Sequence, residues 1–71
     1  MDIADNPVEA ARKAAGLSLS GLANRTGIPR TTLRRKLGHP LELTLSELDD
    51  IAAATGRDSA ALFQSLRTEA A

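Results

Sequence analysis

The sequence predicts an all-α fold, with five short helices packed into one small domain. Thirteen alanines and eleven leucines dominate the hydrophobic residues, and both residue types have high helix propensity. Phe63 is the only aromatic residue, and β-branched residues are scarce, which argues against a β-barrel or sandwich. A chain of 71 residues leaves room for a single domain, residues 1–71, with a lean core and ends that fray.

Composition also excludes several classes of protein and site. The chain has no cysteine and one histidine, so disulfides, thiolate metal sites and two-histidine sites are ruled out. No apolar run approaches the ~18 residues of a membrane span, and the acidic N-terminus lacks the apolar stretch of a signal peptide. We therefore expect a cytoplasmic protein without a cofactor, a metal or a small-molecule ligand.

Charge is distributed unevenly along the chain, although the formal net charge is zero. Residues 1–9 carry a net −3 and residues 42–71 a net −4, whereas residues 10–41 contain no acid and carry +7. A basic middle of this kind is either a solvated face or a surface that attracts nucleic acid.

The first helix is expected to begin after Asn6 and to end near Gly16. Asn6 is a favourable N-cap, Pro7 suits the first helical position, and Glu9 complements the helix dipole. Its apolar face would consist of Val8, Ala11 and Ala15.

Two further helices, joined by a tight turn, are expected between residues 18 and 37. The first begins at Ser18 and ends at Gly27, where a left-handed backbone is expected. Ile28 precedes a proline and should be extended, whereas Pro29 should start the next helix. The apolar positions of that helix are Leu33 and Leu37.

The fourth helix should follow a linker, residues 39–43, whose Leu41 and Leu43 are expected in the core. Thr44 and Glu47 form a capping-box pattern at its start, and Gly56 ends it. Its apolar stripe would consist of Leu45, Leu48, Ile51 and Ala52.

The fifth helix is expected to be capped by Asp58. Its inward face would consist of Ala61, Leu62 and Leu66, with Phe63 beside them in either the core or a dimer contact.

The most informative segment runs from Leu19 to Leu37, LSGLANRTGIPRTTLRRKL. Ala23 is small where the two helices lie closest, Gly27 turns the chain, and Ile28 fills the gap between them. This is the spacing of a helix-turn-helix at about residues 19–37. With the leading helix and the trailing pattern LSELDDIAAATGRDSAALF, the chain resembles the Cro and lambda-repressor-like (XRE-type) helix-turn-helix family over about residues 7–66.

The resemblance implies a five-helix DNA-binding domain whose third helix enters the major groove. Matched positions imply base contacts from Arg30, Thr31, Arg34 and Arg35, since arginine can bind guanine through two hydrogen bonds. Implied phosphate contacts are the backbone amides of Leu19 and Ser20, and the side chains of Asn24, Arg25, Lys13 and His39.

One position departs from the family pattern. The family usually has an apolar residue where this chain has Lys36, so Leu37 would supply the core contact instead. The rotation of the helix end, and whether Arg34 or Arg35 faces a base, therefore stays open.

Structural alternatives exist for several of these residues. The hydroxyls of Thr31 and Thr32 could simply bond the backbone of the first turn. Arg25 could be an ordinary solvated arginine, and His39 a loop residue.

The leading hypothesis is a sequence-specific regulator of transcription that binds double-stranded DNA, most simply a Cro-type phage or prophage repressor occupying an operator in a bacterial cell or phage-infected host. The alternative is a helical protein–protein interaction module that does not bind DNA. An enzyme is a weaker hypothesis, because no nucleophile–base or carboxylate pair converges in the sequence. Two copies are expected on a palindromic operator, with at most a weak homodimer in solution through Phe63 and Leu66.

Overall fold

The computed structural model describes residues 6–70 of the chain, and the side chains of residues 6–68. In chain order the elements are α1 (Pro7–Ala14), α2 (Leu19–Thr26), α3 (Arg30–Gly38), the 3-10 turn η2 (Pro40–Glu42), α4 (Leu45–Thr55) and α5 (Ser59–Ala70). This part of the chain contains five α-helices and no strand, which confirms the all-α expectation. The acidic Asp2 and Asp5 lie outside the described residues, as does the expected fraying at the N-terminus.

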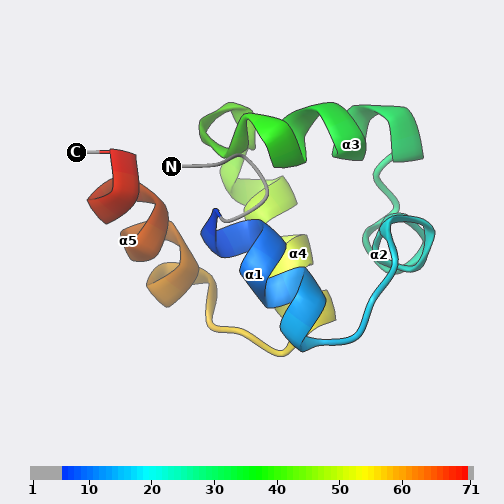
Figure 1. Ribbon diagram of the computed structural model, residues 1–71, viewed down its shortest axis with the longest axis horizontal. Coiled ribbons are helices and arrows are strands. Elements are labelled where there is room, and N and C mark those ends of the chain that lie inside the picture. The colour runs from blue at the N-terminus through cyan, green and yellow to red at the C-terminus, as the bar shows by residue number, and fades with distance from the viewer. Residues whose placement is uncertain (1–5, 71) are drawn as a thin grey trace.

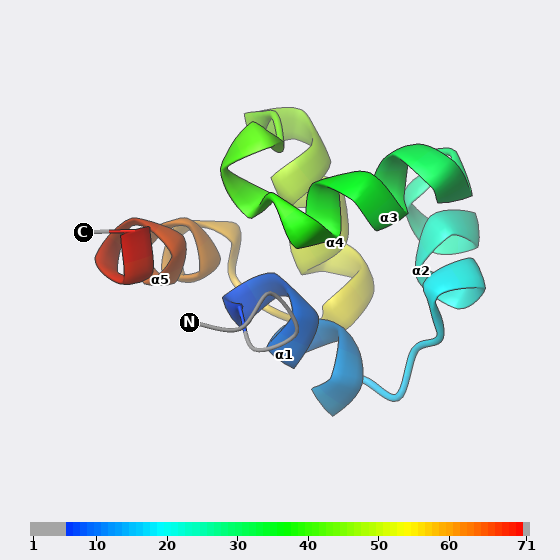
Figure 2. The same cartoon turned by 45° about the horizontal axis from the view of Figure 1, so that its top comes forward.

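The central helix is α4, which packs against α1, α2 and α5. Helix α3 packs mainly against α2 and η2. It runs along one edge of the molecule, and α5 lies at the other end (Figure 1). The turned view separates the same two helices (Figure 2). One long side of α3 is therefore left uncovered by the other helices.

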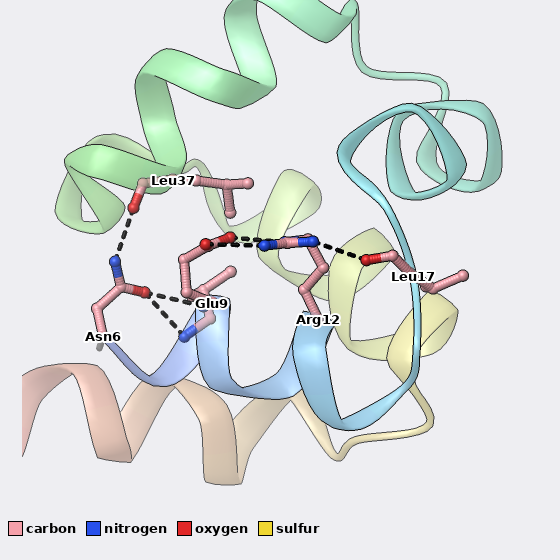
Figure 3. A network of polar contacts seen from close by, with 6 residues as sticks. Asn6, Glu9, Arg12, Leu17 and Leu37 are labelled. Carbon is pink, nitrogen blue, oxygen red and sulfur yellow. Dashed lines mark hydrogen bonds and ion pairs between the residues drawn. The ribbon is translucent and has the colours of Figure 1, made fainter. Parts of the chain in front are cut away.

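Asn6 caps two helices with one side chain (Figure 3). Its Oδ1 accepts hydrogen bonds from the backbone N–H groups of Val8 and Glu9, both at 3.0 Å, and so caps the start of α1. Its Nδ2 donates to the backbone carbonyl of Leu37 at 2.7 Å, near the end of α3. Asn6 is only 1% exposed. The expected N-cap is confirmed, whereas sequence analysis did not anticipate its connection to α3.

The end of α1 is fixed by Arg12. Its Nε donates to Glu9 Oε1 at 2.7 Å, and its Nη1 donates to the Leu17 carbonyl at 2.7 Å (Figure 3). The ion pair with Glu9 raises the pKa of Arg12. This cation of the basic middle is therefore engaged in holding the connection between α1 and α2.

The turn between α2 and α3 follows the expected pattern with one correction. Gly27 has a φ of 76°, the left-handed conformation expected after a helix end. Thr26 Oγ1 accepts from the Ile28 N–H at 3.3 Å and donates to the Leu22 carbonyl. Pro29 is not the first helical residue, because its ψ of 138° is extended. It is the N-cap, and its carbonyl accepts the first helical bond, from the Leu33 N–H at 2.9 Å.

The caps of the last two helices agree with the sequence. Thr44 Oγ1 accepts from the Glu47 N–H at 3.0 Å, and Glu47 Oε1 accepts from the Thr44 N–H at 2.9 Å, which completes the capping box. Asp58 Oδ2 accepts from the Ala61 N–H at 3.1 Å at the start of α5.

The core draws on every α-helix and on the turn before α3. Its buried apolar residues are Val8, Ala11, Leu22, Ile28, Leu33, Leu37, Leu48, Ile51, Ala52, Leu62 and Leu66. Leu43 is half-buried against this cluster, as expected.

Four residues that were expected in the core are exposed, because each lies outside the part of its element that packs against the core. Ala15 lies beyond the last residue of α1, and Leu45 is the first residue of α4, one turn before its buried stripe begins. Ala61 precedes the inward-facing Leu62 by one residue, which rotates it about 100° away from the core. Leu41, in η2, is 66% exposed.

Candidate nucleic-acid interface

The outward side of α3 carries the four residues implied as base contacts. Leu33 and Leu37, four residues apart, face the core and fix the rotation of the helix. The remaining positions Arg30, Thr31, Arg34 and Arg35 are all exposed. Among the described residues, neither the Thr31 nor the Thr32 hydroxyl forms a hydrogen bond, so the backbone-bonding alternative for them is wrong.

A shallow hollow between α2 and the start of α3 brings three of the implied contacts together. Ser20 and Asn24 line it from α2, and Arg30 lines it from α3, with Gly27 and Ile28 between them. Ser20 and Asn24 are exposed. One anionic group of a ligand would meet two polar side chains and a guanidinium here.

The first amides of α2 lie beside this hollow. Ser18 caps the helix, and its carbonyl accepts the first helical bond, from the Leu22 N–H at 2.9 Å. The amides of Leu19 and Ser20 therefore precede the first helical donor, as amides at a helix start do. The Leu19 side chain packs against the core, so only its backbone is available to a ligand.

The remaining implied phosphate contacts lie on the surface away from that hollow. Arg25, Lys13 and His39 are exposed, at the end of α2, in the last turn of α1 and after the end of α3 respectively.

Two cations of the C-terminal half of α3 are paired with acids. Arg35 Nη1 forms an ion pair with Glu42 of η2, and Lys36 Nζ donates to Glu47 Oε1 of α4 at 2.7 Å. By contrast, Arg30 and Arg34 form no hydrogen bond or ion pair within the described part of the chain. The unpaired positive charge of α3 thus lies in its N-terminal half and middle.

The polar Lys36 near the end of α3 does not disturb the core. Leu37 is 5% exposed and supplies the apolar contact, as expected. The Lys36 side chain, 13% exposed, extends to Glu47 and so ties α3 to the capping box of α4.

This Lys36–Glu47 pair predicts a loss of stability in acid. The pKa of Glu47 is lowered from 4.5, mainly because Lys36 donates to its carboxylate and also because the Thr44 N–H does. Such a carboxylate stabilises the fold above its unfolded-state pKa, and the contribution is lost as pH falls through the lower folded-state pKa. Between about pH 5 and about pH 3, the melting temperature of the wild type should therefore fall further than that of Glu47→Gln. Parallel decreases in the two proteins would contradict this role.

Exposed apolar residues lie between α4 and α5. Leu45 and Phe63, which are 72% and 39% exposed, line one hollow between α4 and α5. The Arg67 guanidinium lies 5.8 Å from the centre of the Phe63 ring. Leu66, expected as a surface contact, is 5% exposed and belongs to the core, because it lies one turn after the buried Leu62. Of the two dimer candidates, Phe63 alone is accessible.

Comparison with protein-family models, with curated proteins and with solved structures found no match. Among residues 6–70, no helix combines the length and hydrophobicity that crossing a bilayer requires.

Proposed function

We propose that the chain is a sequence-specific regulator of transcription that binds double-stranded DNA through a helix-turn-helix formed by α2 and α3, most simply as a Cro-type repressor. The observation that carries the proposal is the outward side of α3, where Arg30, Thr31 and Arg34 are exposed and without partners among the described residues. A helix of this kind fits the major groove, where arginine and threonine side chains reach base edges.

The turn and the hollow beside it support the same proposal. The left-handed Gly27 and the buried Ile28 lie between α2 and α3, and a glycine turn followed by an apolar residue is what a helix-turn-helix would use. A backbone phosphate in the hollow would meet Ser20 and Asn24 of α2 together with Arg30 of α3. Such contacts fix the register on the duplex without reading sequence.

A second candidate function, a protein–protein interaction module, is favoured by the exposed Leu45 and Phe63 along one hollow. The same surface suits a weak homodimer with two copies on a palindromic operator. In the first case the hollow binds another protein, and in the second it binds a second copy of this chain. Only DNA binding requires the outward surface of α3.

The deciding experiment is selection of bound sites from a random duplex pool, followed by affinity measurements on the selected site between about 50 and 200 mM salt. DNA binding releases counterions, so affinity should fall steeply as salt rises. A palindromic selected site would support two copies, and an asymmetric site would support one. Failure to enrich any sequence, with weak binding insensitive to salt, would refute DNA binding and favour the interaction module.

A further inference from the structure

Glu42 is placed to control Arg35, one of the four exposed residues on the outward side of α3. The carboxylate comes from η2, the turn that follows α3, and pairs with Arg35 Nη1. Both side chains are about half exposed, at 55% for Arg35 and 51% for Glu42. An exposed pair of this kind contributes little to stability, so a role in folding does not account for it.

On the basis of the proposed function, we propose that Glu42 is a specificity-determining residue, which restrains Arg35 and so weakens binding to DNA of the wrong sequence. A carboxylate and a DNA phosphate compete for the same guanidinium, since both accept its forked hydrogen bonds. Binding to random duplex depends mainly on phosphate contacts, and a phosphate contact from Arg35 requires the pair with Glu42 to break. The carboxylate left behind then faces the negatively charged backbone.

At a selected site, Arg35 can bind a base edge without giving up its ion pair with Glu42. A guanidinium held by a carboxylate through Nη1 keeps its remaining N–H donors and loses fewer rotamers on binding. The pair therefore helps Arg35 when a base edge lies in the right position, and this gain offsets the repulsion between Glu42 and phosphate. Lys36 is similarly held by Glu47, so the cations that could bind phosphate non-specifically at this end of α3 are both restrained.

The test is the variant Glu42→Gln, measured on both random duplex and the selected site. Affinity for random duplex should rise about 3- to 10-fold, and the slope of log affinity against log salt should steepen by about one phosphate contact. Affinity for the selected site should change less than about twofold, so that the specificity ratio falls. Thermal melts should show an unchanged fold.

Two controls separate this mechanism from a general change of charge. Asp50→Asn removes the same charge from an exposed acid of α4 that has no ion pair within residues 6–68. It should change affinity for random duplex less than about twofold. In an Arg35→Gln background, Glu42→Gln should have a clearly smaller effect, because the ion pair is already absent and only the repulsion between the carboxylate and phosphate is relieved.

Equal effects of Glu42→Gln and Asp50→Asn, or an undiminished effect in the Arg35→Gln background, would overturn the proposal while leaving DNA binding intact. A specificity ratio that rises in Glu42→Gln would overturn it as well. A wild-type protein that binds no duplex would instead overturn the proposed function, and this assignment with it.

Discussion

Replacing Asn6 with alanine is expected to lower the free energy of unfolding by about 2–4 kcal/mol. Loss of the N-cap of α1 costs ~1 kcal/mol, and leaving the Leu37 carbonyl without its donor in a buried site costs ~1–3 kcal/mol more. In a domain of this size, each kcal/mol corresponds to about 4–8 °C in melting temperature. Thermal unfolding followed by circular dichroism would therefore show a decrease of at least ~8 °C.

Asn6→Asp separates the capping of α1 from the hydrogen bond to the Leu37 carbonyl. Aspartate is as good an N-cap as asparagine, but an ionised carboxylate cannot donate to the Leu37 carbonyl. The Val8 and Glu9 N–H groups favour the carboxylate, whereas burial, the facing Leu37 carbonyl oxygen and the nearby Glu9 favour the protonated form; we expect the latter three to prevail and to raise the pKa of the new carboxyl. The protonated form can donate, so stability should be best recovered at low pH and lost as pH rises through the raised pKa.

Two outcomes would contradict this account of Asn6. One is an Asn6→Ala protein that melts within ~2 °C of the wild type. The other is an Asn6→Asp protein whose deficit relative to the wild type is the same at about pH 4 and about pH 7.

The double variant Arg30→Ala with Arg34→Ala is expected to lose specific DNA binding without loss of stability. Each arginine that reads a base contributes ~1–3 kcal/mol of specific affinity, so the two together contribute about 2–6 kcal/mol if additive. This corresponds to roughly 30-fold to 10⁴-fold weaker binding to the selected site. Both side chains are exposed and form no hydrogen bond or ion pair within the described residues that folding would lose.

Arg57→Ala is the matched control, because Arg57 is also exposed but lies in the connection between α4 and α5, distant from α3 in Figure 1. It should bind the selected site within about twofold of the wild type, as a surface change away from the interface does. Binding by the double variant equal to that of Arg57→Ala would remove α3 from the interface.

Local signals in the sequence predicted most of the fold. Caps, glycines and prolines act within a few residues, and so the ends of the first four helices and the start of α5 were predicted to within one or two residues, including the left-handed Gly27 and the capping box at Thr44. The end of α5 was not, because fraying was expected after Arg67 and the helix continues to Ala70. Spacing along a helix also identified Leu33 and Leu37 as the buried side of α3. That side determines which residues of α3 face outward.

The errors arose where tertiary placement decides exposure. Leu45 has the right spacing for the apolar stripe of α4, but it lies at the helix end, beyond the packed region. Leu66 was expected both on the inward face of α5 and in a dimer contact, and at 5% exposed it lies in the core. The pairing of Arg35 with Glu42 and the bond from Asn6 to Leu37 join residues 7 and 31 positions apart, and no periodic pattern encodes such contacts.

The residue after Asn6 protects the Asn6 side chain, which joins α1 to α3, from deamidation. Asparagine deamidates to aspartate when the backbone nitrogen of the next residue attacks the side-chain amide and closes a succinimide ring. In this chain the next residue is Pro7, whose nitrogen carries no hydrogen and cannot complete that ring. Asn24, exposed and followed by Arg25, has no such protection. The protein should therefore deamidate first on its surface at Asn24, while the amide that joins α1 to α3 persists for the lifetime of the molecule.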